Sequence, residues 1–433
     1  MPSYGFVADD LTGAADVLAQ AHRHGLEAAL VIGDAPLPVD VDVVGIAGPA
    51  RSLGGAAFDD TVRRDLARMA EVDLDVLLYK VCSTFDSSPT IGSIGRAIEL
   101  LYELFTDHGP IPVAPAQPGF GRFTAFSDHY ASFAGQIHRL DRHPVMSQHP
   151  STPMHEADLR RVLTEQLTNG AEVGSIHLTA YDTDLFTELW KDRRHAPDIT
   201  AFVVDAVNEQ HMDTIARSLR HPGDDGRPAL VVGSGGIMAA LARTAGDGSV
   251  RTAGPQRSSG PVLAVSASAS SVTADQLEDA ISHGWVDIPV PAELLRGHQD
   301  ALLTALDEQV ATALSAGHHV VVHATRGTSD PRYTASGPVD PAHLGSLIGA
   351  LAGRMAAAGL TQDLAVFGGD TSSHALIAMG VRELRVSDQF VTAGPICRTD
   401  DHATVAGCRL LLKGGQVGPP DILRRFAGQV AHP

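Results

Sequence analysis

Short runs of Val, Ile, Leu and Ala alternate along the chain with longer stretches whose apolar residues recur at helical spacing. Continuous apolar strands that alternate with helices are typical of a parallel sheet covered on both faces. In the first half of the chain the predicted strands are 5–8, 28–32, 43–47, 76–81, 111–114, 176–178, 202–204 and 230–232. The predicted helices between them include 13–24, 59–70 and 91–105.

Two segments interrupt this alternation. Residues 119–150 are rich in Gly, Phe, Tyr and His, which favours a hairpin or a flap. Residues 244–260 are small, polar and glycine-rich, which favours a linker. We therefore expect an α/β fold of two domains, 1–243 and 261–433, with mainly parallel sheets and an active-site cleft between them.

Composition narrows the class of protein. The net charge of −19 argues against nucleic-acid binding, which needs clustered Lys and Arg. Three cysteines without a CxxC pair fit a reducing compartment, and we expect a cytoplasmic protein. The first residues lack the pattern of a secretion signal, and no apolar run reaches the length of a membrane span. We expect no membrane partner, and a homodimer stays among the alternatives.

Two adjacent carboxylates follow the first predicted strand, in the segment VADDLTGAAD at residues 7–16. Asp9 and Asp10 repel each other, so we expect a cation, a metal ion or a ligand hydroxyl beside them. Either acid could accept a proton from a substrate hydroxyl. The alternative is that one of them only caps the helix that begins near Thr12 and Gly13.

A second polar segment, LLYKVCSTFDSSP at residues 77–89, also follows a predicted strand. Lys80 is a single cation in an apolar stretch, and burying it is costly without a partner. The partner could be a carboxylate of the protein or of a substrate. Arg51, after another strand, could also bind a carboxylate through its planar guanidinium.

The second half contains a strand, two glycines and a helix in the segment LAVFGGDTSSHALIAMG at residues 364–380. Backbone N–H groups at such a helix start form an anion site that suits phosphate. Three further strands end in polar loops in the same half, and each alone could be a plain turn. They are the serine loop with Ser266, Ser268 and Ser270, the segment 319–332, and the segment 410–418 with Gly414 and Gly415.

Several familiar signatures are missing from the sequence. It contains no GxxxxGK[ST] phosphate loop, no GxSxG segment and no HExxH segment. The segment VVGSGGIMAAL at residues 231–241 matches a dinucleotide-binding loop only in part, because its third glycine is missing. The histidines are scattered and lack neighbouring residues at metal-ligand spacing, and we interpret them as solvated or structural.

Taken together, ADDLTGAAD, KVCSTFDSSPTIGSIG, HPSTPM, the serine loop, GGDTSSHALIAMGV and LKGGQVG resemble the four-carbon acid sugar kinases, in this order and over almost the whole chain. The resemblance implies an N-terminal domain that binds the sugar acid and a C-terminal domain that binds ATP. The implied sugar-acid residues are Asp10, Arg51, Lys80, Ser83 and Thr84, and we add their neighbours Asp9 and Cys82 as candidates. The implied ATP residues are Ser266, Gly368, Gly369, Asp370, Thr371 and Gly415, and we add Ser268 of the same serine loop.

Some residues depart from the usual family pattern. Ser93 stands where the family has Asn, Ala267 where it has Gly, and Asp370 where many members have Glu. The segment 393–398, AGPICR, replaces the family's PGVPW. Threonate, erythronate, their 3-oxo forms and a branched oxo acid such as 3-oxo-isoapionate all stay open as substrates.

The residues and the resemblance agree on phosphoryl transfer, in which catalysis is mostly positioning and charge stabilisation. We predict a kinase that uses ATP and Mg2+ to phosphorylate a terminal hydroxyl, with Asp10 as the catalytic residue and Asp370 as its rival. The alternatives from other classes are an NAD-dependent dehydrogenase that uses the GSGG segment at 233–236, and a sugar-acid sensor without turnover.

Overall fold

The computed structural model of the chain describes two compact units. The first unit contains residues up to Ala28 and Pro38–Val250, and the second contains Ala29–Leu37 and Arg251–Pro433. The described residues are 3–149, 151–168, 170–182, 185–220, 227–246, 249–252, 254, 256–297, 299–327, 329–332, 339–368, 370–391, 394–401, 404–415 and 417–430.

The first unit is built on a parallel sheet with the strand order β3-β1-β4-β11-β5-β10-β9. Its five central strands are buried along nearly their whole length, as expected for a sheet covered on both faces. The strands are β1 (Tyr4–Ala8), β3 (Val43–Ala47), β4 (Val76–Lys80), β5 (Ile111–Ala114), β9 (Glu172–Ile176), β10 (Ile199–Val204) and β11 (Ala229–Gly233).

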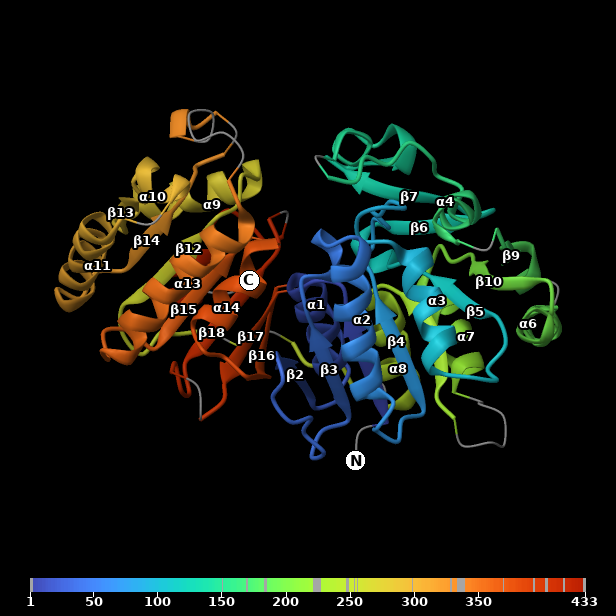
Figure 1. Cartoon of the computed structure of the whole chain (residues 1–433). Coiled ribbons are helices and arrows are strands. Elements are labelled where there is room, and N and C mark those ends of the chain that lie inside the picture. The colour runs from blue at the N-terminus through green and yellow to red at the C-terminus, as the bar shows by residue number, and fades with distance from the viewer. Residues whose placement is uncertain are drawn as a thin grey trace. The chain divides into compact units, whose positions relative to one another are not determined.

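The helices of the first unit form two packed groups. Helix α8 packs against α1 and α7, whereas α3 packs against α2 and α4. Figure 1 shows α2 and α3 on the viewer's side of this sheet, with α8 behind it. The helices are α1 (Leu11–Arg23), α2 (Gly55–Met69), α3 (Ile94–Leu104), α4 (Leu159–Gln166), α5 (Thr179–Asp182), α6 (Phe186–His195), α7 (Glu209–Leu219) and α8 (Gly235–Ala245).

A small antiparallel sheet interrupts the alternation where the sequence predicted a hairpin or a flap. It contains β6 (Arg122–Ala125), β7 (Asp128–Phe133) and β8 (Gln136–Arg139). Its buried His129 bonds through Nε2 to the backbone oxygen of Ser83 at 2.8 Å, and burial lowers the pKa of His129 to about 4. This neutral imidazole therefore attaches the small sheet to the Lys80–Thr84 segment.

The second unit has the strand order β13-β14-β12-β15-β18-β17-β16-β2. The first five strands are parallel, and β17, β16 and β2 each pair antiparallel with their neighbour. The strands are β2 (Ala28–Ile32), β12 (Val262–Ser266), β13 (Val286–Pro289), β14 (Val320–His323), β15 (Asp363–Phe367), β16 (Glu383–Val391), β17 (Gly394–Thr399) and β18 (Arg409–Lys413).

Strand β2 was not expected in the second unit, because it comes early in the chain. It pairs with β16 in the register Leu30↔Leu384, and all five of its residues are buried. The apolar pattern of residues 28–32 predicts a buried strand correctly, but periodicity does not identify its partner.

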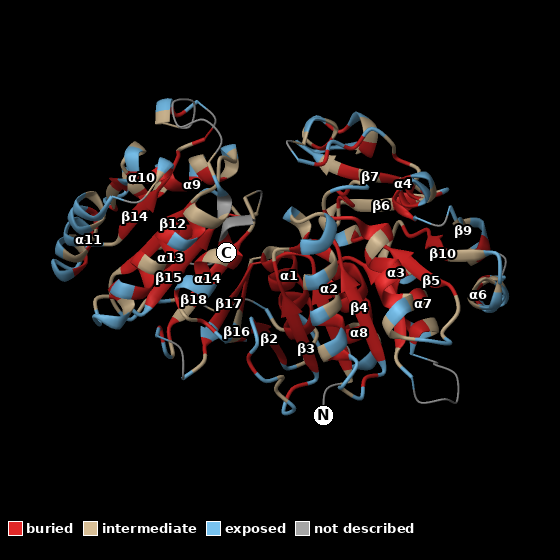
Figure 2. Cartoon of the chain, viewed as in Figure 1, coloured by how far each residue is buried: buried red, intermediate tan, exposed pale blue. Residues whose placement is uncertain are grey.

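Helices cover the parallel part of the second sheet. Helix α9 packs against α15, and α13 packs against α14 and α11. The core of this unit includes Phe367, Phe390 and Phe426, and Figure 2 shows buried residues concentrated along β12, β15 and β18. The helices are α9 (Ser271–Ser282), α10 (Ala292–Arg296), α11 (Asp300–Ser315), α13 (Pro341–Ala357), α14 (Asp370–Ala378) and α15 (Ile422–Ala427).

The predicted α/β class with mainly parallel sheets is confirmed. Among the described helices, none is long and apolar enough to cross a membrane.

Candidate active site

Three neighbouring strands of the first unit end at one edge of its sheet and bring the predicted polar residues together. Ala8, the last residue of β1, pairs with Ala47 of β3 on one side and with Lys80 of β4 on the other. Backbone hydrogen bonds extend this alignment past the strands. Asp9 N–H donates to Lys80 O at 3.0 Å, and Arg51 N–H donates to Asp9 O at 2.9 Å.

Arg51 is the cation that offsets the two adjacent carboxylates. Its Nε and Nη2 donate to Asp9 at 3.1 and 2.8 Å, and its Nη1 and Nη2 donate to Asp10 at 3.0 and 2.9 Å. A guanidinium has five N–H donors, so these bonds occupy four of them. The expectation that Arg51 binds a carboxylate is met by the protein's own acids, which leaves one N–H for a ligand.

Asp10 caps helix α1 and is saturated with donors. Its Oδ1 accepts from Gly13 N–H at 2.7 Å and its Oδ2 accepts from the Thr12 hydroxyl at 2.5 Å. With the two bonds from Arg51, each oxygen of this carboxylate accepts two hydrogen bonds. Asp10 therefore caps helix α1, as the alternative interpretation of the acid pair predicted.

Asp9 is equally buried but has fewer donors around it. Each of its oxygens accepts one bond from Arg51. Burial raises the pKa of Asp9 and the neighbouring Asp10 charge adds to this, although Arg51 opposes both. Asp9 thus has the two properties of a proton acceptor: lone pairs that Arg51 does not occupy, and a carboxylate less stable in its charged form than usual.

Lys80 lies against the start of helix α1 and is buried. Its ammonium donates to Val81 O at 2.7 Å, and it makes no ion pair within the part of the chain that the structure describes. A Cβ on Gly13 would lie 2.8 Å from Lys80 Nζ and 2.5 Å from Asp10 Oδ1. The Gly13 position therefore gives the ammonium room beside the acid pair. Of the two partners that the sequence left open for Lys80, a carboxylate of the protein does not lie within ion-pair distance among the described residues.

The segment after Lys80 forms a chain of hydroxyl, thiol and carboxylate groups. Cys82 Sγ lies 2.9 Å from Thr84 Oγ1, and the Thr84 hydroxyl donates to Asp86 at 2.6 Å. Burial raises the pKa of the Cys82 thiol to about 11, so Cys82 is neutral near pH 7. Burial acts in the same direction on Asp86, but the Arg51 charge and the Thr84 hydroxyl outweigh it and lower the pKa of Asp86.

The second unit also aligns its predicted residues at strand ends. Phe367 of β15 pairs with Ser266 of β12 on one side and Lys413 of β18 on the other. Gly368 follows Phe367 with φ of 137°, a backbone conformation that favours glycine. A Cβ on Gly415 would lie 2.8 Å from Ser268 Oγ, so the turn after β18 needs a glycine to approach the serine loop closely.

The structure describes the predicted phosphate seat in part. Gly369 lies outside the described residues, and the backbones of Asp370 and Thr371 begin helix α14. Ser372 is buried, and its hydroxyl donates to Gly368 O. The expected roles of Gly369, Asp370 and Thr371 therefore stay predictions.

Helix α9 begins beside the serine loop without a side-chain cap. Ser270 is its N-cap residue and makes no capping hydrogen bond. The Ser270 hydroxyl is buried and finds no partner among the described residues. A buried hydroxyl of this kind at a helix start fits a place where a ligand oxygen would complete the hydrogen bonding.

Lys413 is a buried lysine beside the serine loop to which the sequence interpretation gave no role. It is completely buried, and its ammonium donates to Thr273 Oγ1 at 3.1 Å and to Gly414 O at 3.0 Å. Its Nζ also lies 4.5 Å from the centre of the Phe367 ring. Burial lowers the pKa of Lys413 to about 7. The chain has three lysines, and the pattern of an apolar strand that ends in Lys, recognised at Lys80, is repeated here.

The glycine-rich segment at 233–236 is closed by the protein itself. A Cβ on Gly235 would clash with the buried Asp16 carboxylate, and one on Gly236 would clash with Ala116 O. Gln117 Nε2 donates to Asp16 at 3.0 Å and holds the carboxylate there. These glycines allow close packing at the start of α8, which argues against a dinucleotide in this position.

No group of three or more His, Cys, Asp or Glu side chains suited to a metal ion occurs among the residues that the structure describes. The position of Mg2+ therefore stays a prediction.

Comparison with known proteins assigns both halves of the chain. A family model described as a sugar-binding N-terminal domain matches residues 4–241, and one described as a nucleotide-binding C-terminal domain matches residues 263–423.

Three curated relatives illustrate matches over nearly the whole length of both chains. A 3-oxo-isoapionate kinase from Paraburkholderia graminis is 31% identical, with 95% of this chain and 91% of the relative covered. A 3-oxo-tetronate kinase from Cupriavidus necator is 30% identical, with 99% and 98% covered. A D-threonate kinase from Bordetella bronchiseptica is 28% identical, with 98% and 97% covered.

Solved structures share the fold. A protein from Salmonella typhimurium LT2 matches with a TM-score of 0.77 at 22% identity, with 98% of each chain covered. A Haemophilus influenzae protein matches with a TM-score of 0.71 at 23% identity, with 98% of this chain and 99% of the other covered.

The buried state of Lys413 can be tested through stability. We expect Lys413→Met to stabilise the protein most below about pH 7, where wild type must bury a charged ammonium. As the pH rises, native Lys413 loses its proton before the unfolded chain does, so wild type regains roughly 2–3 kcal/mol between about pH 7 and pH 9. Urea unfolding across this range measures the difference, with the exposed Lys191→Met as control. Identical pH profiles for the two variants would contradict the assignment.

Proposed function

The chain belongs to the four-carbon acid sugar kinase family, and we propose that it transfers the terminal phosphoryl group of ATP to a terminal hydroxyl of a four-carbon acid sugar. That it is a sugar acid kinase follows from its full-length relatives. The observation that supports the finer proposal is the buried cluster at the ends of β1, β3 and β4, where Arg51 binds both acids and Lys80 makes no ion pair with a carboxylate among the described residues.

Lys80 is the proposed partner of the substrate carboxylate. An ammonium has three N–H donors, and the described structure uses one of them on Val81 O. Arg51 has only one donor left after it binds Asp9 and Asp10. A sugar acid whose carboxylate reaches Lys80 would bring its hydroxyls to the half-buried Cys82 and Ser83 and to Thr84.

Asp9 is the proposed proton acceptor, and Asp10 the residue that holds the site in place. We expected Asp10 to be catalytic, but its oxygens already accept four hydrogen bonds. Asp9 accepts two, and its pKa is raised by burial. Asp370 stays the rival from the second unit. In phosphoryl transfer, a general base contributes less to the rate than the alignment of the reacting groups does. The kinetics of variants at the three acids can separate their roles.

ATP is proposed to bind the second unit at the ends of β12, β15 and β18. Ser266, Ser268 and Gly415 come close together there, and Gly368, Gly369, Asp370 and Thr371 would supply the start of α14 to a phosphate. Lys413 lies behind this turn and would stabilise it. Mg2+ is proposed to enter with the ATP phosphates, where it neutralises charge during transfer.

The identity of the sugar acid has two candidates. The relatives named 3-oxo-tetronate kinase and D-threonate kinase favour a linear four-carbon acid, whereas the 31%-identical relative favours a branched acid, 3-oxo-isoapionate. The packing of Gly235 and Gly236 against Asp16 and Ala116 argues against the dehydrogenase alternative.

Activity of the purified protein tests this function. We expect ATP-dependent ADP release with at least one of threonate, erythronate, their 3-oxo forms and 3-oxo-isoapionate, with Mg2+ present. A coupled ADP assay measures it, and removing Mg2+ with EDTA should abolish it. Absence of turnover with every acid, together with sugar-acid binding, would favour the sensor instead.

The roles of the acids separate by kinetics. We expect Asp9→Asn to lower kcat by about 10²- to 10⁴-fold, because the proton acceptor is lost, with the KM for ATP unchanged. Asp10→Asn should mainly weaken sugar-acid binding and helix α1, since it loses hydrogen bonds from Arg51 and Gly13. Asp370→Asn makes the same change at the rival acid in the second unit and serves as the comparison for Asp9→Asn. Near-normal kcat in Asp9→Asn would overturn the assignment of the base.

A further inference from the structure

A large cavity lies in the first unit at the sheet edge opposite the candidate active site. Its volume is about 1010 Å3. Its lining residues lie on helices α6 and α7 or at and before the starts of strands β5, β10 and β11, whereas the predicted sugar-acid residues lie at or after strand ends. Ala229 lines the cavity at the start of β11, and Gly233 at the other end of β11 pairs with Lys80. This strand separates the two places by roughly 13 Å.

The lining is cationic although the protein is strongly acidic. Lys191, Arg194, Arg217 and Arg227 line the cavity, and Asp107, the single acid among its lining residues, forms an ion pair with Arg227 at 3.5 Å. The whole chain carries a net charge of −19. A concave surface lined with charge of one sign raises the local concentration of ions of the opposite sign. The cavity therefore favours an anion.

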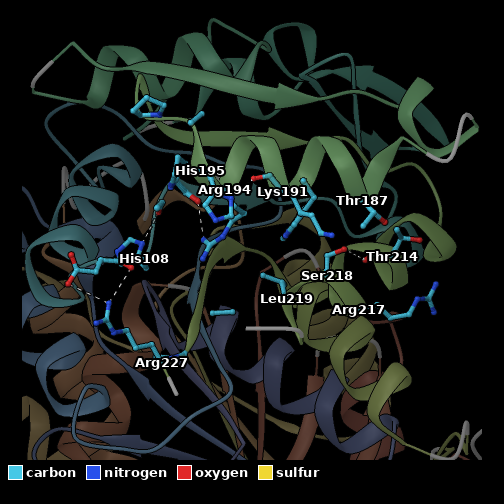
Figure 3. A pocket seen from close by; sticks show the side chains of 18 residues that line it. His108, Thr187, Lys191, Arg194, His195, Thr214, Arg217, Ser218, Leu219 and Arg227 are labelled. Atoms are coloured by element: carbon cyan, nitrogen blue, oxygen red, sulfur yellow. Dashed lines mark hydrogen bonds and ion pairs between the residues drawn. The ribbon is translucent and has the colours of Figure 1, made fainter. Parts of the chain in front are cut away.

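Helix dipoles account for only part of this charge. Arg194 and Arg217 lie in the last turns of α6 and α7, where a cation also compensates the negative helix end. Lys191 lies earlier in α6, and Arg227 lies in the segment that leads into β11. Figure 3 shows Arg194 and Lys191 on one side of the cavity and Arg227 on the other, with the Arg217 side chain at its margin and directed outward.

The walls of the cavity are fixed by internal contacts. Arg194 donates to Pro110 O at 3.0 Å and Arg227 donates to Thr106 O at 3.0 Å. These bonds join the segment before β5 to helix α6 and to the segment before β11. A Cβ on Gly109 would clash with Arg194 O, so this turn approaches α6 as closely as a glycine allows. A cavity with fixed walls is suited to a small ligand, because little order has to be created on binding.

Two further features indicate the kind of ligand. His108 bonds through Nδ1 to Gly109 O at 2.8 Å, and its buried Nε2 has no partner among the described residues. Trp190 and Leu219 contribute an apolar part of the lining. The volume exceeds what a single inorganic phosphate would fill and lies at the upper end of small-molecule sites.

We propose that this cavity binds a small phosphate ester, with its phosphate among Lys191, Arg194 and Arg217 and an apolar or aromatic part against Trp190 and Leu219. Lys and Arg both bind phosphate oxygens strongly through charge-assisted hydrogen bonds. The site is separate from the residues proposed for sugar acid and ATP, and its occupancy does not depend on turnover.

Calorimetric titration of the full-length protein with phenyl phosphate and with inorganic phosphate tests the proposal. We expect phenyl phosphate to bind more tightly than inorganic phosphate. In the double variant Lys191→Glu/Arg217→Glu, which changes two exposed residues, the affinity should fall by roughly tenfold or more. Kinase activity of this variant should match wild type.

Two control variants separate a specific site from general charge and from the nucleotide unit. Arg142→Glu/Arg161→Glu makes the same charge change at exposed positions outside the cavity. Lys413→Met alters the proposed nucleotide unit. Both should bind phenyl phosphate as wild type does. The proposal is overturned if wild type binds no phenyl phosphate, or if the cavity variant binds it no more weakly than the Arg142/Arg161 control.

Discussion

The contact of one guanidinium with two neighbouring carboxylates is the interaction on which the candidate active site depends. Asp9 and Asp10 are both buried at a strand end, where two unscreened negative charges would repel each other strongly. Arg51 binds both and also bonds through its backbone to Asp9. Removing one partner of a buried ion pair typically costs about 3–5 kcal/mol. The arrangement of β1, β3 and β4 and the charge balance of the site are therefore linked.

This charge balance determines which groups are left for a substrate. Arg51 is committed to the two acids, and Gly13 gives Lys80 room beside α1, so Lys80 is the cation that we propose for the sugar carboxylate. The second unit uses a lysine differently. Lys413 is buried among neutral groups and its pKa falls to about 7, so it supports the turns around the serine loop more than it offers a fixed charge. The two lysines at strand ends therefore lie in different surroundings.

Much of this could be predicted from the sequence, and the reasons for the rest are physical. Buried parallel strands and the polar residues at their ends follow from apolar runs such as 76–80, because residues at carboxyl ends of parallel strands meet at one edge. The partner of β2 could not be predicted, since a five-residue apolar strand carries no information about its neighbour. The saturation of Arg51 depends on side-chain geometry, and the basic cavity depends on residues from four separate segments.

The central claim, that Lys80 binds the substrate carboxylate while Arg51 serves the protein's own acids, is tested most directly by comparing a sugar acid with its neutral amide. Calorimetric titration of wild type and Lys80→Met measures the preference for the acid in each. We predict a strong preference in wild type that disappears in Lys80→Met, with the fold intact by circular dichroism. An undiminished preference for the acid in Lys80→Met would contradict the account.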